Sequence, residues 1–212
     1  MSVFLCSAFI VSPLVKGGNE VQEEGTVSPQ LRAMNASNHF QTIGTAPLKV
    51  MWFDVYDATL SSASGRYEEG EPILLRLEYA RDISKRALVN ETRKQLQNQL
   101  SSHSEKPSDQ HGLLFDELKL EEGLSRLSEL WPSVEQGDVI SFYLDDADTG
   151  VFLFNDQYLG DIRIQGFAKA FADIWLGESS EYPELARRLK GEFKRSDSQS
   201  KVKAEGGGYV HE

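Results

Sequence analysis

Residues 49–60 carry the clearest strand pattern in the chain, because valine, threonine and aromatic residues dominate them. Apolar side chains alternate onto both faces of this stretch, with Trp52 and Tyr56 on one face and Met51 and Phe53 on the other. A strand that is apolar on both faces is covered on both faces. The pattern therefore predicts a strand in the middle of a sheet.

The rest of the hydrophobic pattern separates into blocks of strands and blocks of helices. Period-two alternation and short apolar runs predict further strands at 39–43, 73–81, 139–144, 151–154 and 158–164. Apolar residues at three- and four-residue spacing predict four helices. The first begins after Ser84, the second covers 115–130, the third runs from Phe167 to Gly177 and the fourth starts at Pro183. Segregated blocks of this kind predict an α+β fold, an antiparallel sheet with helices on one face.

The two ends of the chain differ from this periodic middle. Residues 2–15 are apolar but too short for a membrane-spanning helix of roughly 20 residues. They match either the remnant of a signal peptide, which would make the protein periplasmic or secreted, or a loosely packed terminus of a cytoplasmic protein. Residues 16–38 have the composition of a linker, and 192–212 that of a disordered charged tail. We therefore expect a single domain at 39–191, with 1–38 and 192–212 loosely packed.

Composition and charge narrow the possible partners. The 212 residues include 22 Lys plus Arg and 33 Asp plus Glu, so the formal net charge is −11. This balance argues against nucleic acid as a partner, since nucleic-acid binding depends on basic side chains that neutralise phosphates. The single cysteine, Cys6, excludes an internal disulfide. We expect no transmembrane span.

The sequence carries little of the chemistry that marks common enzymes. It has no glycine-rich phosphate loop, no dinucleotide fingerprint and no Gly-x-Ser-x-Gly elbow, so no cofactor is expected. The histidines are not spaced as ligands on one element, so no metal site is expected either. The acidic run 145–150 has a faint likeness to a calcium loop, but Gly150 comes one position early and Gln157 replaces the bidentate glutamate. A solvated hairpin turn accounts for it better.

Polar residues on the apolar strands are the remaining candidates for a site. Asp54 and Asp57 indicate either a turn or sheet edge, or a polar spot that faces a ligand cavity. Cations and tyrosine hydroxyls over an apolar cavity are typical of a site that binds the carboxylate or phenolate end of an apolar molecule. The candidates of this kind on the strands are Lys49, Tyr56, Thr59, Arg76, Tyr79, Arg81 and Tyr143. The alternative is that the tyrosines belong to the core and the cations extend to water.

Several motifs together resemble the bacterial chalcone isomerase-like family. Three motifs resemble the first half of the sequences of that family. They are Phe-Asp-Val-Tyr-Asp-Ala-Thr-Leu at 53–60, Ser-Gly-Arg-Tyr at 64–67 and Leu-Arg-Leu-Glu-Tyr-Ala-Arg-Asp-Ile at 75–83. Three more resemble the second half of those sequences: Val134-x-x-Gly137-Asp138, Phe152-x-Phe154-Asn155 and the segment 167–177. The resemblance covers roughly residues 39–191. It implies the chalcone isomerase fold, in which a large antiparallel sheet carries a layer of helices.

The resemblance also implies two activities. Plant members close chalcones to flavanones without a cofactor, and non-catalytic relatives bind fatty acids through an arginine and a tyrosine. Tyr56 matches that tyrosine, whereas the arginine is missing, and Lys49 at best replaces it without its bidentate fork. Ile174 stands where the plant isomerases place a small polar residue.

Three hypotheses follow for the function. We expect a protein that binds a small hydrophobic ligand, such as a fatty acid, without turnover. The site would use Tyr56 and Lys49, with Thr59 or Arg81 as a helper. Tyr56 and Lys49 share one cleft only if the strand bulges between them, because an odd separation places them on opposite faces of a regular strand. The alternatives are an intramolecular lyase of the chalcone isomerase type and an interaction module with a filled cavity.

Overall fold

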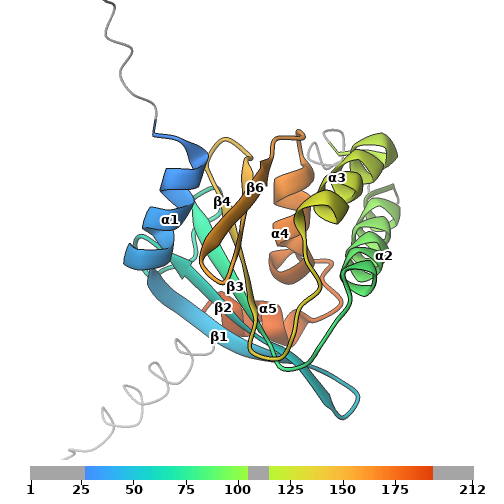
Figure 1. The fold of residues 1–212 in the computed structure, drawn as a ribbon, viewed down its shortest axis with the longest axis horizontal. Helices are drawn as coiled ribbons and strands as arrows, with labels where there is room; N and C mark the ends of the chain where they lie inside the picture. The colour runs from blue at the N-terminus through green and yellow to red at the C-terminus, as the bar shows by residue number, and fades with distance from the viewer. Residues whose placement is uncertain (1–26, 105–114, 193–212) are drawn as a thin grey trace, which may run out of the picture.

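The computed structural model describes residues 27–104 and 115–192. In these residues six strands form one antiparallel sheet whose spatial order follows the order of the sequence (Figure 1). The strands are β1 (Gln41–Val50), β2 (Phe53–Ser62), β3 (Ile73–Tyr79), β4 (Val139–Leu144), β5 (Gly150–Phe154) and β6 (Gln157–Ile162). Every neighbouring pair is antiparallel. The sequence prediction of an α+β fold is thus confirmed.

Four helices form a layer on one face of this sheet (Figure 1). They are α2 (Lys85–Ser104), α3 (Glu117–Leu130), α4 (Phe167–Leu176) and α5 (Pro183–Leu189). The main core lies between this layer and the sheet, and it centres on a cluster of aromatic rings: Trp131, Phe142, Phe152, Phe171 and Trp175. Such edge-to-face ring pairs add about 0.5–1.5 kcal/mol each beyond the apolar area that they bury.

Close packing in this layer depends on glycine at one point. Gly123 on α3 faces the ring of Phe167 on α4, and a Cβ atom at this position would come within 2.0 Å of that ring. Phe167 is fully buried, so its ring has no free space into which it can move. The glycine therefore lets α3 approach α4.

The opposite face of the sheet carries a fifth helix, α1 (Pro29–His39), which lies across β3, β5 and β6. Its N-cap Ser28 accepts a hydrogen bond from Leu31 N–H, and Pro29 occupies the first turn, where its missing N–H costs nothing. Ala33 and Ala36 face the sheet and pack in a second, smaller core against Leu74, Tyr143, Val151 and Leu153. The expected linker at 16–38 is therefore wrong over residues 29–38, and helices cover both faces of the sheet.

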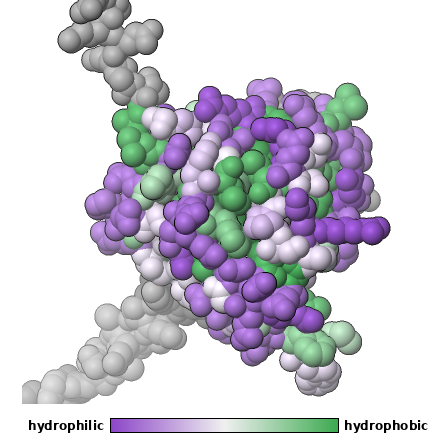
Figure 2. Space-filling view, in the orientation of Figure 1, coloured by the Kyte–Doolittle hydropathy of each residue, from purple (hydrophilic) through white to green (hydrophobic). Residues whose placement is uncertain are grey.

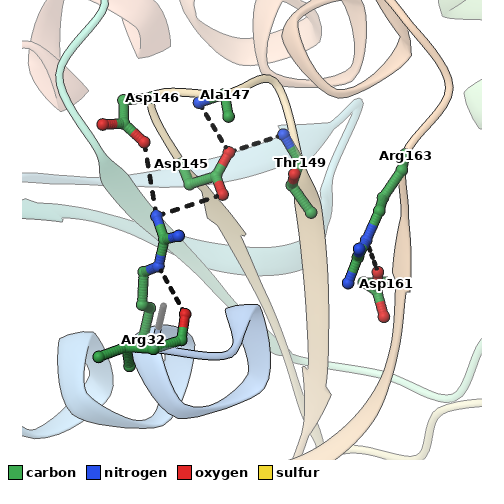
Figure 3. Close-up of polar contacts among 8 residues, drawn as sticks. Arg32, Asp145, Asp146, Ala147, Thr149, Asp161 and Arg163 are labelled. Atoms are coloured by element: carbon green, nitrogen blue, oxygen red, sulfur yellow. Dashed lines mark hydrogen bonds and ion pairs between the residues drawn. The ribbon is translucent and has the colours of Figure 1, made fainter. Parts of the chain in front are cut away.

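The acidic turn between β4 and β5 holds helices on both sides of the sheet. Arg32 of α1 lies 3.7 Å from Asp145 and 3.5 Å from Asp146 (Figure 3). Asp145 is buried and accepts hydrogen bonds from Ala147 N–H and Thr149 N–H, at 3.0 and 2.7 Å. The carboxylates of this turn are thus engaged by the protein itself. The expected hairpin turn is present, but Asp145 is not solvated.

A third carboxylate of the same turn caps α4. Asp148 accepts hydrogen bonds from Gly166 N–H and from Lys169 N–H, the latter at 2.9 Å, at the start of the helix. A negative side chain at this position satisfies donors that have no partner within the helix and complements the helix dipole. The turn therefore fixes the start of the helix that carries Trp175.

The stretch 49–60 is not the single central strand that its composition predicts. β1 ends at Val50, Met51 and Trp52 form a two-residue turn, and β2 starts at Phe53. The segment is a hairpin at the edge of the sheet, and Met51, Trp52 and Phe53 are exposed rather than covered. The expected strand at 39–43 likewise belongs to the end of α1 and the start of β1.

Two other expectations concern the ends of the chain and membranes. The signal-like segment at 2–15 and nearly all of the charged tail lie outside the described residues. None of the helices in the described ranges is long and apolar enough to cross a membrane.

Candidate functional site

Tyr56 and Trp175 meet in the core between the sheet and the helical layer. Tyr56 lies on the face of β2 that carries Ala58 and Leu60, all three buried beneath the helices. Trp175 continues the apolar stripe of α4 that begins with Phe167. Their sequence patterns place both side chains on the same core: period two along β2 and period 3.6 along α4.

A hydrogen bond joins these two side chains. Trp175 Nε1 donates to the Tyr56 hydroxyl oxygen at 2.8 Å, and both residues are buried. The phenol can accept this bond and still donate its own proton. Among the described residues the Tyr56 O–H has no acceptor, so its proton is available to another partner.

Tyr79 places a second phenol beside the first. It pairs with Tyr56 across β2 and β3, and the two rings meet edge to face at 5.8 Å. In the described part of the chain the Tyr79 hydroxyl makes no hydrogen bond. Burial raises the pKa of both tyrosines far above the ordinary value of 10.0. Both are therefore neutral hydrogen-bond donors at physiological pH.

Polar residues of α2 and of the chain before α5 surround the edge of this region. Gln95 is buried and donates to Glu91 and to Glu181, each at 2.9 Å. Lys94 lies 3.6 Å from Glu91 and 3.5 Å from Glu181. Burial is the main cause of the raised pKa of Tyr56, and the negative charge of Glu91 adds a smaller contribution in the same direction.

Lys49 does not share this interior with Tyr56. Its ammonium pairs with Asp54 at 2.7 Å on the protruding end of the hairpin, and its side chain is 60% exposed. The hydrogen bond and charge of Asp54 raise the pKa of Lys49. A register shift does occur here, because Leu48 pairs with Tyr56 and Lys49 with Asp54, but it does not bring the two side chains together. Leu48, directly opposite Tyr56, is apolar and buried.

The two other predicted site residues also lie elsewhere. Thr59 is an odd number of residues from Tyr56 and faces the opposite side of the sheet, where its hydroxyl lies 3.4 Å from that of Thr45. Arg81 is exposed, and its guanidinium lies 5.3 Å from the centre of the Phe53 ring. Of the four predicted residues, the structure places Tyr56 alone in the core.

Sequence reasoning did not predict Trp175 as a partner of Tyr56, and it named Tyr79 only as one of several polar residues on the apolar strands. The strand alternation that puts Tyr79 on the core face was a usable signal. The bond to Trp175 joins residues 119 positions apart, and no local pattern predicts it. Ile174 is buried and adds no polar group. The described residues contain no group of three or more His, Cys, Asp or Glu side chains that could hold a metal ion.

Comparisons with known proteins agree with this architecture. A family model described as "Chalcone isomerase-like" matches residues 23–191. An uncharacterised protein of Haemophilus influenzae is 27% identical over 162 residues, which cover 74% of this chain and 70% of that protein. The crystal structure of a fatty-acid binding protein of Arabidopsis thaliana matches with a TM-score of 0.53 and 12% identity. That match covers 73% of this chain and 88% of the other. At this identity the match establishes the fold alone.

Proposed function

The chain belongs to the chalcone isomerase-like family, and we propose that it binds a small hydrophobic ligand between the sheet and the helical layer, without turnover. The observation that carries the proposal is the pair of tyrosine hydroxyls on this core. Trp175 donates a hydrogen bond to the Tyr56 oxygen, which leaves the Tyr56 hydroxyl proton free to bind a ligand oxygen. The structural neighbour described as a fatty-acid binding protein gives independent support for a ligand of this class.

The charges around the tyrosines favour a ligand whose polar end is neutral. Glu91 adds a small contribution to the raised pKa of Tyr56, after that of burial, and Lys94 already pairs with Glu91 and Glu181. A carboxylate without a cationic partner is costly to bury. A neutral phenol donates readily to a carbonyl or to a protonated carboxylic acid. We therefore propose a fatty acid in its protonated form, or a long-chain carbonyl compound, as the ligand.

The alternative is an intramolecular lyase that acts on a chalcone-like enone. That reaction requires a group that stabilises the attacking phenolate of the substrate. Lys49 was the candidate for this role, but it pairs with Asp54 outside the core. Ile174, on the helix that faces the tyrosines, brings no polar group. These observations favour binding over catalysis.

The test is a titration with cis-parinaric acid, a fluorescent long-chain fatty acid, into the wild-type protein and the variant Tyr56→Phe. Loss of the hydroxyl removes a hydrogen bond to the ligand and should weaken binding about threefold to tenfold, which corresponds to about 0.5–1.5 kcal/mol. Because the proposal requires a neutral carboxylic acid, binding should also tighten as the pH falls. Binding that is equally tight in Tyr56→Phe would refute this site.

A matched control is available on the other face of the sheet. Tyr143 is as buried as Tyr79 but packs under α1 in the second core, so Tyr143→Phe should leave the affinity unchanged. The lyase alternative is tested in parallel with a standard chalcone. Saturable formation of the flavanone, abolished in Tyr56→Phe, would replace the binding proposal with the enzymatic one.

A further inference from the structure

The β1–β2 hairpin ends in a cluster of exposed apolar side chains that no other described element covers. We call Val50, Met51, Trp52 and Phe53 the hairpin tip. Trp52 is 91% exposed and Met51 is 83% exposed, with Phe53 and Val50 at 59% and 44%. In Figure 2 this tip forms a projection at the lower right, coloured pale to green against the purple body. Exposed aromatic residues gathered at one point indicate an interaction site.

The tip projects because the β1–β2 hairpin extends beyond the end of β3, the next strand in the sheet. β2 pairs with β3 from Tyr56 onward, with one further hydrogen bond from Ala80 N–H to Val55 O at 3.0 Å. Beyond this point the hairpin is held by its own pairs, Lys49 with Asp54 and Val50 with Phe53 (Figure 1). At about 3.3 Å per residue, Trp52 extends roughly 10 Å beyond Val55.

The sequence of the turn favours a role for its side chains. Met51 has a φ of 57°, a left-handed conformation that glycine or asparagine adopts more readily. Glycine at Met51 would relieve this strain, yet the chain carries a long apolar side chain there, followed by tryptophan and phenylalanine. The position gives these side chains no packing role in the core, since they are exposed.

The size of the tip argues against a protein as the occupant. With about 150–250 Å² for each aromatic side chain, Trp52 and Phe53 together with their neighbours offer roughly 500 Å². A stable protein interface needs about 800 Å² from each partner. The tip is convex and narrow, whereas an apolar element that enters the boundary between headgroups and acyl chains needs a depth of only about 5–10 Å. Tryptophan is enriched at this boundary in membrane proteins.

Charges at the base of the tip suit a bilayer without net charge. Lys49 and Arg81 lie beside the tip with Asp54, so cations and a carboxylate stand at the level of the headgroups. The chain as a whole carries a net charge of −11, which repels anionic lipid surfaces. We propose that the hairpin tip inserts into the interface of a zwitterionic lipid bilayer and docks the protein there.

The full-length protein can be tested with phosphatidylcholine vesicles. Vesicle sedimentation should show binding by the wild-type protein, and binding should fall at least tenfold in the triple variant Met51→Ser, Trp52→Ser, Phe53→Ser. The control is Leu118→Ser, because Leu118 is 82% exposed and α3 carries no second exposed large hydrophobic residue. This control should stay within twofold of the wild type.

Trp52 also reports its own insertion. Trp131 and Trp175 are buried, so quenching by bromine-labelled phosphatidylcholine should act on Trp52 fluorescence. The tip residues do not line the site at Tyr56 and Tyr79, so the triple variant should bind cis-parinaric acid like the wild type. The two proposals, membrane docking and ligand binding, can therefore fail independently of each other. The proposal is overturned if wild-type protein does not sediment with the vesicles, if the triple variant and Leu118→Ser behave alike, or if Trp52 is not quenched. It is also overturned if light scattering shows that the wild-type protein is a dimer and the triple variant a monomer. That result would identify a second copy of the chain as the occupant of the tip.

Discussion

Replacing Tyr56 with phenylalanine keeps the ring but removes the acceptor of the Trp175 indole N–H. Both side chains are buried, so in the unliganded protein water replaces the lost partner poorly. A buried donor that loses its acceptor costs about 1–3 kcal/mol. Taking about 2 kcal/mol for the loss and a urea dependence of about 2 kcal/mol/M, the urea midpoint should fall by roughly 1 M.

The assay is equilibrium unfolding in urea, followed by far-UV circular dichroism. Tyr143→Phe is the control, since the Tyr143 hydroxyl has no hydrogen-bond partner among the described residues, and it should cost less than about 0.5 kcal/mol. A double-mutant cycle with Trp175→Phe isolates the pair, and the coupling free energy should be about 1 kcal/mol. A coupling free energy near zero, or equal costs for Tyr56→Phe and Tyr143→Phe, would refute the reasoning.

Three further predictions concern the supports of the fold. Burial raises the pKa of Tyr56 and Tyr79 above the unfolded value of about 10, so their contribution to stability is intact below that pH and is lost as the pH rises beyond it. Absorbance at 295 nm should therefore show at least two tyrosines that ionise only on unfolding, and ionisation of all tyrosines near pH 10 in the folded protein would contradict this. Asp145→Ala leaves two backbone N–H donors without their carboxylate and should lower the free energy of unfolding in urea by about 1.5–3 kcal/mol. It also removes the ion pair with Arg32 of α1, so amide hydrogen exchange in α1 should become faster, and unchanged exchange would show that this ion pair does not hold the helix. Gly123→Ala should lower the free energy of unfolding by about 1–3 kcal/mol despite the better helix propensity of alanine, because its Cβ overlaps the Phe167 ring. A rise in the thermal midpoint would show that α3 and α4 can move apart to accommodate the methyl group.

The periodic parts of the sequence predicted the fold well. Alternation identified β3, and apolar runs between turn residues identified β4, β5 and β6. The stripe from Phe167 to Trp175 identified α4 with its end at Gly177. In each case a long apolar face is buried by one partner layer, so the local pattern and the tertiary structure agree.

The errors occurred where tertiary contacts override the local pattern. The turn at Met51 and Trp52 contains none of the glycine, asparagine or proline residues that usually mark a hairpin. Helix α1 buries only Ala33 and Ala36, so its apolar stripe is too narrow to distinguish it from a linker. Covered faces cannot be inferred from apolar composition alone, as the exposure of Trp52 demonstrates.

The candidate site was predictable only in part. Strand alternation places Tyr56 on a core face, and the family resemblance drew attention to it. The position of Lys49 depends on where the hairpin turns, and the Tyr56–Trp175 bond depends on how α4 docks on the sheet. Neither is encoded in local spacing.

The most direct measurement of ligand binding is native mass spectrometry of the purified protein, before and after incubation with oleic acid at mildly acidic pH. We expect one bound hydrophobic molecule per chain, either co-purified or added, and a lower occupancy in Tyr56→Phe than in Tyr143→Phe. A protein that stays unliganded under both conditions, or that binds oleic acid equally in the two variants, would contradict the proposal that the tyrosines of β2 and β3 form a lipid-binding site.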